Sequence, residues 1–376
     1  MSRRVLEVVV GPVAHGGHCV ARHDGRVIFV RHTLPGERVR LQLTDTSTDR
    51  FWRADALEVL EPSRDRQPSG CPVAGPGGCG GCDFQHVSES GEVELKRAVV
   101  AEQLQRLAGI DWAGEVEAVP PTLTGWRTRM RYLAGPDGPA LRAHRSHELI
   151  TIPTDGCPIA TVDPRELGVP EVAEDTPLTV VDSDSEQLLL VGDADESVAE
   201  QAAGRRFEVQ AQGFWQVHPA AADTLVAALL DGLRPQPGER AFDLFCGVGL
   251  FAGALADAGV TVWGVESDKP AISHARRNVR EARFTTGRVD KVLHKLPRRT
   301  DLVVLDPPRA GAGRKVLQQL SERTPRAIGY VACDPAALAR DLAYAAELGW
   351  RPSSIRAFNL FPRTHHVECV AILEPA

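Results

Sequence analysis

The sequence predicts an α/β protein with a doubly wound, Rossmann-like sheet in its carboxyl-terminal part, preceded by a small β-barrel and a β-rich central region. Two observations support this. From about residue 205 onward, apolar strand-like runs alternate with helical patterns, as in parallel sheets covered by helices. Residues 5–60 instead alternate apolar and polar positions between glycine turns, as small antiparallel barrels do. We therefore expect a barrel at 1–60, a central domain at 61–204 and an α/β domain at 205–376.

Composition and charge predict a soluble cytoplasmic protein and do not exclude nucleic acid as its partner. The chain has 376 residues, 43% of them hydrophobic, and no apolar run approaches the roughly 20 residues that span a bilayer. Residues 171–200 hold ten acidic residues and no Lys or Arg, so without them the net charge would be +3 rather than −7. We interpret that stretch as a solvated surface, so nucleic acid stays a possible partner. No membrane association and no obligate protein partner is indicated, and we expect a cytoplasmic monomer.

Secondary structure follows from periodicity and capping residues. Helical periodicity from 92 ends at Gly109, and Asp334 followed by Pro335 is a helix start signal. We expect helices at 92–109, 249–258 and 335–347, and strands at 240–245, 261–266, 301–305, 327–332, 354–358 and 367–373.

The run DLFCGVG at 243–249 is a candidate cofactor turn. Its glycines, Gly247 and Gly249, allow close backbone approach between a strand and a helix N-terminus. Glu266 follows at the end of the next strand, where a carboxylate can accept hydrogen bonds from both ribose hydroxyls. Ala252 replaces the third glycine of a nicotinamide fingerprint, so the pattern favours S-adenosyl-L-methionine. A purely structural tight turn is the alternative.

The run DPPR at 306–309 follows another apolar strand, at the edge where open α/β sheets bind ligands. Similar motifs with an aromatic fourth residue serve amine methylation, and Arg309 in that place counts against this chemistry.

Cys333 lies at the junction between an expected strand and the N-terminus of an expected helix, and this position makes it a candidate nucleophile. Partial positive charge at the helix N-terminus favours the thiolate, although Asp334 opposes it. Glu368, just inside the last strand, is a candidate general base. The alternatives are a buried structural thiol and an ordinary surface carboxylate.

Three cysteines lie in the irregular stretch at 68–82, and a fourth lies across the β-rich region that follows it. The chain has eight cysteines, and a reducing cytoplasm disfavours disulfides between them. Four thiolates suit zinc or an iron–sulfur cluster, and the spacing favours the cluster because zinc ribbons have two close pairs. Independent buried cysteines are the alternative. The four candidates are Cys71, Cys79, Cys82 and Cys157.

Taken in order, these motifs resemble the RNA 5-methyluridine methyltransferase family, which modifies uracil C5 in tRNA or 23S rRNA. The barrel, with GGHCVA at 16–21 and LPGE at 34–37, resembles an RNA-binding TRAM domain. The run CGGCDFQH at 79–86 is similar to the family's cluster motif, which implies a [4Fe-4S] cluster on the four cysteines. Cys333 falls on the family's nucleophile and Glu368 on its base. The positions matching the family's cofactor-binding residues are Gln216, Phe245, Glu266 and Asp306, beside the turn glycines Gly247 and Gly249.

Three departures concern cofactor contacts. The family usually has Asn where this chain has His218, and some members have Asn at the positions of Leu250 and Arg288.

The resemblance implies an enzyme that transfers a methyl group from S-adenosyl-L-methionine to uracil C5 in structured RNA. Arg127, Arg129 and Arg131 alternate along one expected strand, and we expect them to line an RNA groove. Two other functions remain open: a methyltransferase acting on an amine or a protein side chain, and a non-catalytic RNA-binding or assembly factor. The intact set of candidate site residues argues against the latter.

Overall fold

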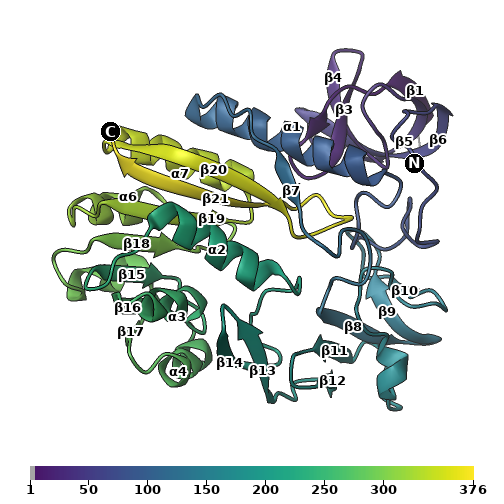
Figure 1. Cartoon of the computed structure of the whole chain (residues 1–376). Coiled ribbons are helices and arrows are strands. Elements are labelled where there is room, and N and C mark those ends of the chain that lie inside the picture. Colours follow the sequence, from purple (N-terminus) through teal and green to yellow (C-terminus); the bar gives the residue numbers. More distant parts are fainter. Residues whose placement is uncertain (1–4) are drawn as a thin grey trace.

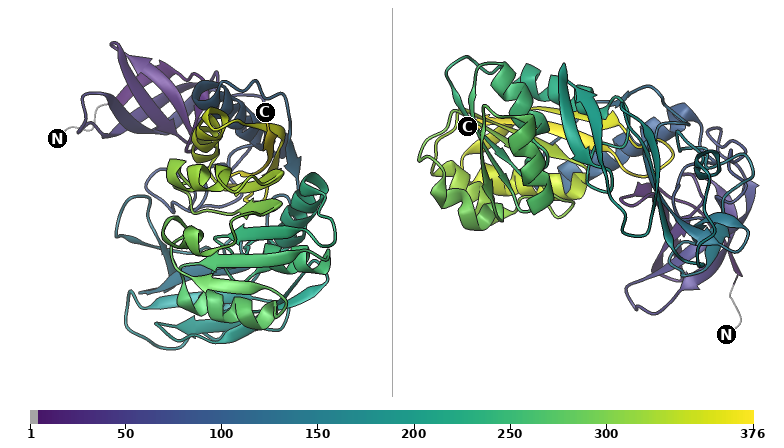
Figure 2. Two further views of the ribbon diagram at one scale, coloured as in Figure 1. Left: turned by 90° about the vertical axis from the view of Figure 1, so that its left-hand side faces the viewer. Right: turned by 90° about the horizontal axis from the view of Figure 1, so that it is seen from below.

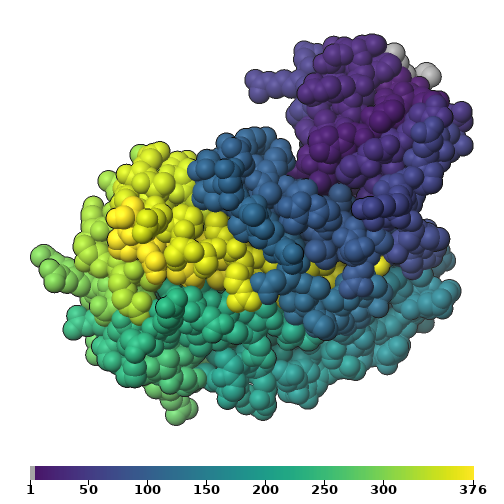
Figure 3. Space-filling view, turned by 45° about the horizontal axis from the view of Figure 1, so that its top comes forward, coloured from purple at the N-terminus to yellow at the C-terminus, as the bar shows by residue number. Residues whose placement is uncertain are grey.

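The structure is a computed structural model that describes residues 5–376 (Figure 1). The first four residues of the barrel expected at 1–60 lie outside the described part. An amino-terminal barrel, a β-rich central region and a large α/β domain follow one another, which confirms the predicted fold class. In the space-filling view the barrel projects from a body formed by the other two parts (Figure 3).

The barrel is one six-stranded sheet in the order β1-β5-β6-β4-β3-β2. Exposed and buried residues alternate along β1 and through the first half of β5, and the buried ones form a core of their own. The strands are β1 (Val5–Val9), β2 (Val13–Ala14), β3 (His18–His23), β4 (Arg26–Arg31), β5 (Arg38–Asp45) and β6 (Phe51–Glu61).

The central region holds a five-stranded sheet in the order β10-β9-β8-β11-β12 and a separate hairpin, β13-β14. Much of the acidic stretch at 171–200 lies here, on exposed turns between strands. The strands are β8 (Arg129–Gly135), β9 (Gly138–Arg142), β10 (Leu149–Thr151), β11 (Pro177–Asp182), β12 (Gln187–Val191), β13 (Ser197–Ala202) and β14 (Arg205–Gln210).

The α/β domain is built on an eight-stranded sheet in the order β17-β16-β15-β18-β19-β21-β20-β7. Neighbours from β17 to β19 are parallel, whereas β21 runs antiparallel to both β19 and β20. The strands are β7 (Val116–Ala118), β15 (Arg240–Leu244), β16 (Thr261–Glu266), β17 (Arg283–Thr286), β18 (Leu302–Leu305), β19 (Ala327–Ala332), β20 (Trp350–Asn359) and β21 (Glu368–Pro375).

Helices cover both faces of this sheet, and each face has its own apolar core (Figure 2). Helices α2, α3 and α4 pack on one face, and α5, α6, α7 and α1 on the other. Their bounds are α1 (Glu89–Ala108), α2 (Ala221–Leu233), α3 (Leu250–Asp257), α4 (Lys269–Asn278), α5 (Val289–Val292), α6 (Arg314–Ser321) and α7 (Pro335–Glu347). Short 3₁₀ turns occur at Pro164–Leu167 and Leu293–Lys295.

Two elements that precede the central sheet in sequence join the α/β domain in space. Helix α1 packs against α7, and β7 pairs in parallel with the edge strand β20. The Trp112 indole N–H, between them in the chain, donates to the Ile355 carbonyl at 2.9 Å. The domain limits 1–60, 61–204 and 205–376 stay predictions.

Capping explains why the predicted helices begin and end where they do. Asp334 Oδ1 accepts from the Ala337 N–H at 2.8 Å, and Pro335 occupies the first turn, so α7 spans the predicted 335–347. Gly109, in the left-handed conformation, caps the carboxyl end of α1.

The expected RNA groove of alternating arginines is wrong for Arg129. Its side chain is 9% exposed and forms an ion pair with Glu200 at 2.7 Å. Arg127 is half-buried, and its Nε donates to the Arg129 carbonyl at 3.2 Å, whereas Arg131 is exposed. Alternation placed the arginines on one face, but the hairpin β13-β14 supplies a carboxylate that covers Arg129.

Within residues 5–376, no helix is long and apolar enough to cross a membrane.

Replacing Arg129 with Met should lower the free energy of unfolding by about 3–5 kcal/mol, because Glu200 would be left buried without its counter-charge. Arg131→Met on the same strand is the control and should change it by less than about 0.5 kcal/mol. Urea unfolding of the two variants beside the parent measures this. Equal destabilisation would contradict a structural role for the pair.

Candidate active site

The site lies at the edge of the sheet where the parallel strands end. Phe245 follows β15, Glu266 ends β16, Asp306 follows β18 and Cys333 follows β19. Because these strands are parallel, their carboxyl ends meet at one edge, which is where open α/β sheets bind ligands.

The glycine turn after β15 is shaped for close approach of a ligand. Gly247 and Gly249 have φ of 52° and 94°, and a Cβ on Gly249 would come within 3.2 Å of Val279. Asp243 is fully buried below the turn and accepts from the Ala252 N–H at 2.8 Å. Burial raises the pKa of Asp243 to about 8.

Glu266 is held in place by backbone donors. One carboxylate oxygen accepts from the Asp268 N–H at 2.8 Å, and the other from the Gly247 N–H at 3.2 Å. The side chain therefore links the end of β16 to the glycine turn, as the predicted ribose contact requires.

Gln216 lies half-buried between β14 and α2. Its neighbour Val217 accepts at its carbonyl from the Thr128 N–H at 2.9 Å, which ties this segment to the central region. His218 accepts at Nδ1 from the Ala220 N–H at 3.2 Å, so Nε2 donates to the Pro121 carbonyl at 3.1 Å. An Asn side chain has the same pairing capacity, which gives this departure a structural explanation.

Strand pairing places the two candidate catalytic residues opposite each other. The last pair between β19 and β21 is Ala332 with Cys369. One step further along the antiparallel register, Cys333 stands opposite Glu368. Side chains at opposed positions share a face of the sheet, with Cβ atoms about 4.5–5.5 Å apart.

Burial shifts both groups toward their protonated forms. Burial, followed by the nearby Glu368 carboxyl, raises the pKa of Cys333 to about 11, whereas Arg309 acts in the opposite direction. Burial and then the Asp306 carboxyl raise the pKa of Glu368 well above its usual value. Desolvation therefore opposes the thiolate that the helix N-terminus favours.

Arg309, the fourth residue of DPPR, turns toward the loop that precedes Glu368. Its guanidinium lies 3.0 Å from His366 Nε2. Burial, His365 and Arg309 lower the pKa of His366 to about 3, so His366 is neutral and accepts this hydrogen bond.

Two barrel residues contact segments that adjoin the candidate catalytic residues. His15 Nε2 lies 3.1 Å from Asp334, the residue after Cys333. Gly17, two residues further on, packs so closely that a Cβ would come within 2.8 Å of the His365 Cβ. Neither contact could be predicted from the sequence, because each joins segments more than 300 residues apart.

The four predicted cluster cysteines line one cavity of about 570 Å³ together with Arg127. No group of three or more His, Cys, Asp or Glu side chains in residues 5–376 is placed to hold a single metal ion. A zinc ion needs all its sulfur ligands about 2.3 Å from one point. The arrangement therefore does not support a mononuclear site. The cysteines are Cys71, Cys79, Cys82 and Cys157.

Family models match three parts of the chain. The TRAM domain matches residues 1–57, the methyltransferase small domain 219–328, and tRNA (Uracil-5-)-methyltransferase 291–376. An uncharacterized RNA methyltransferase of Streptomyces coelicolor is 48% identical, over 98% of this chain and 93% of its own length. The 23S rRNA (uracil(1939)-C(5))-methyltransferase RlmD of a Shewanella species is 31% identical, over 96% and 94%.

The chain belongs to the RNA uracil-C5 methyltransferase family. It is an S-adenosyl-L-methionine-dependent RNA (uracil-C5)-methyltransferase with an amino-terminal TRAM domain. In fold it resembles the Pyrococcus abyssi tRNA (uracil-54, C5)-methyltransferase, whose crystal structure contains S-adenosyl-L-homocysteine. That likeness covers 98% of this chain and 99% of the other, with a TM-score of 0.74 and 23% identity.

The contact between His15 and Asp334 of this methyltransferase should depend on pH. The hydrogen bond to Asp334 raises the pKa of His15, and, against burial, the bond from His15 lowers the pKa of Asp334. The raised His15 pKa stabilises the folded state below the unfolded-chain value of about 6.5. That stabilisation is lost as pH rises through the higher folded value.

We expect an NMR titration to give His15 a pKa above about 6.5, falling toward that value in an Asp334→Asn variant. The charged groups near this pair also include Glu102 and Arg106 of α1. Glu102→Gln serves as a control, with a smaller shift. An unchanged His15 titration in Asp334→Asn would disprove the contact.

Proposed function

We propose that this methyltransferase forms 5-methyluridine in structured RNA, either 23S rRNA or tRNA, with Cys333 as nucleophile and Glu368 as general base. The observation that carries the proposal is the β19-β21 register, whose last pair is Ala332 with Cys369. Continued by one residue, this register brings the Cys333 thiol and the Glu368 carboxyl together at the ligand-binding edge of the sheet.

The chemistry needs both groups because uracil C5 is a weak nucleophile. A bond from the Cys333 thiolate to C6 turns C5 into an enolate carbon, which accepts the methyl group. Glu368 then removes the C5 proton, and the electrons of that C–H bond re-form the C5–C6 double bond as the C6–S bond breaks. S-adenosyl-L-methionine would supply the methyl group from its sulfonium: the S–CH₃ bond would break as the C5–CH₃ bond forms, and S-adenosyl-L-homocysteine would leave.

Arg309 is the group that favours the Cys333 thiolate, since its positive charge opposes the effects of burial and of the neighbouring acids on the thiol pKa. Three carboxyl groups, Asp306, Glu266 and Glu368, interact electrostatically at this edge, and burial raises the pKa of Asp306 to about 7. A cationic cofactor bound here would favour their ionised forms and so prepare Glu368 as a base.

The cofactor would be held by residues from four separate segments. The glycine turn admits its polar end, Glu266 accepts from ribose hydroxyls, and Asp306 lies two parallel strands away on the same edge. The assignment rests on the family match and on this placement. The proposed set is Gln216, Phe245, Gly247, Gly249, Glu266 and Asp306.

Cys333→Ala should abolish 5-methyluridine formation, because no bond to C6 can form. Glu368→Gln should instead accumulate a protein–RNA adduct that survives denaturing gels, because the C5 proton stays in place. Glu374→Gln, exposed at the far end of β21, is the matched control and should behave as the parent.

Mass-spectrometric mapping of 5-methyluridine in RNA from cells with and without the gene identifies the substrate. Full methylation by Cys333→Ala would contradict the covalent route. Loss of a modified amine or protein side chain, with uridines unchanged, would favour the second kind of methyltransferase.

For the cysteine cavity we propose a [4Fe-4S] cluster. The four thiols come from two distant segments yet line one cavity. A cluster places each thiolate on a different iron, so its sulfur atoms stand farther apart than around zinc. Arg127 would offset the negative charge of the cluster.

Anaerobically prepared protein should bind about four iron atoms per chain and absorb visible light. Cys82→Ser should lose most of the iron. Cys19→Ala, a buried barrel cysteine outside the cavity, should keep it. Zinc in place of iron, or unchanged iron in Cys82→Ser, would contradict the cluster.

A further inference from the structure

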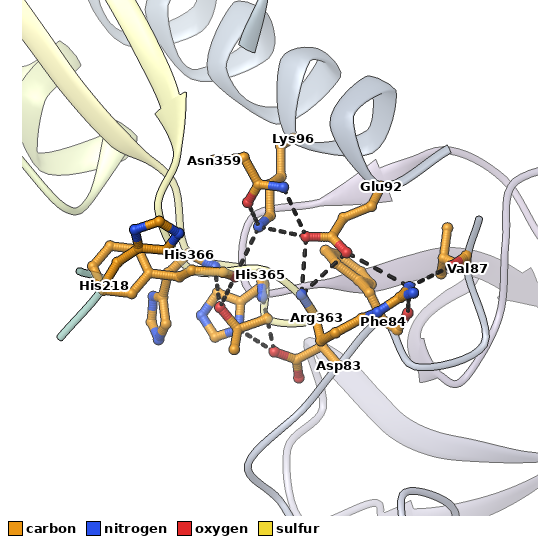
Figure 4. A network of polar contacts seen from close by, with 12 residues as sticks. Asp83, Phe84, Val87, Glu92, Lys96, His218, Asn359, Arg363, His365 and His366 are labelled. Carbon is orange, nitrogen blue, oxygen red and sulfur yellow. Dashed lines mark hydrogen bonds and ion pairs between the residues drawn. The ribbon is translucent and has the colours of Figure 1, made fainter. Parts of the chain in front are cut away.

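A buried ion pair on α1 contacts the loop that leads into Glu368 (Figure 4). Glu92 and Lys96 are each 1% exposed, and Lys96 Nζ lies 2.8 Å from Glu92 Oε1. Burying two charges costs several kcal/mol per ion, and an apolar pair of similar size is often as stable. The pair therefore calls for an explanation other than stability.

All three N–H donors of the Lys96 ammonium have acceptors within the protein. They go to Glu92, to Asn359 Oδ1 at 2.6 Å, and to the Phe361 carbonyl at 3.0 Å. Asn359 ends β20, and Phe361 is the second residue of the connection to β21. One side chain thus fixes the start of the loop at residues 360–367.

Glu92 fixes the middle of the same loop. Its two carboxylate oxygens accept from the Arg363 backbone N–H at 3.0 and 3.1 Å. Arg363 has a φ of 66°, a left-handed conformation that is strained for a non-glycine residue. Its guanidinium donates to the carbonyls of Val87 at 2.6 Å and Phe84 at 3.3 Å.

Asp83 fixes the end of the loop. One of its oxygens accepts from the His365 N–H at 3.0 Å and lies 2.6 Å from His365 Nδ1. The other lies 3.5 Å from Arg31 of the barrel. Contacts at 361, 363 and 365 therefore hold alternate residues of the loop up to three positions before Glu368.

We propose that Glu92 and Lys96 are positioning residues for Glu368: they hold the loop at 360–367 so that the carboxyl group stands opposite Cys333. The inference rests on the proposed roles of Cys333 and Glu368. It predicts a defect confined to the second half of the reaction, because adduct formation depends on Cys333 while adduct breakdown depends on Glu368.

The test follows formation and decay of the protein–RNA adduct in a single turnover by rapid quenching and denaturing gels. Glu92→Gln alone would leave Lys96 buried without its counter-charge and endanger folding. The principal variant is therefore the neutral, similarly sized pair Glu92→Gln with Lys96→Met. Glu94→Gln is the matched control, since Glu94 lies on the same helix in an exposed pair with Arg97.

We expect the double variant to form adduct at the parental rate and to release product up to about 100-fold more slowly than the parent. A displacement of the Glu368 carboxyl by about 1 Å would have an effect of this size. Asp83→Asn, acting through His365, should show the same split more weakly. Glu94→Gln should match the parent in both steps.

Parental decay in the double variant, or equal slowing of formation and decay, would overturn the positioning role. Glu368→Gln is run beside it to separate the two proposals. If Glu368→Gln accumulates adduct and the double variant does not, only the positioning role fails. If Glu368→Gln accumulates none, the proposed base role itself fails.

Discussion

The antiparallel pairing of β21 with β19 is the constraint on which the candidate site depends. In a fully parallel sheet only carboxyl ends of strands reach the ligand edge. Reversing one strand brings an amino end there too, so Glu368, first in β21, stands beside Cys333, which follows β19. A one-residue shift in this register would turn Glu368 to the other face of the sheet.

Desolvation governs the electrostatics of the site. The Cys333 thiol and the carboxyls of Asp243, Asp306 and Glu368 are all shifted toward their protonated forms, with burial as the main cause. In such a site, an added positive charge favours the ionised forms of the candidate catalytic groups. Arg309 supplies part of that charge from the protein itself.

The barrel and the segment that follows Cys82 contact the surroundings of the candidate catalytic residues. His15 contacts the cap of α7, Gly17 packs against His365, and Asp83 joins Arg31 to the same loop. The barrel, predicted to bind RNA, and the segment after the predicted cluster cysteines therefore also border the loop that leads into Glu368, the candidate base.

The sequence by itself determined the fold class, six of the eight strands of the α/β sheet and the bounds of α7, because periodicity and capping are local properties. It missed the four-residue β17 and the three-residue β7, which are too short to show a period. It also treated Arg129 as an RNA contact, since alternation tells which residues share a face but not what covers that face. The tertiary structure alone decided that Arg129 pairs with Glu200, His15 with Asp334 and Lys96 with Asn359, because each of these partners lies far away in sequence and is chosen by packing rather than by local pattern.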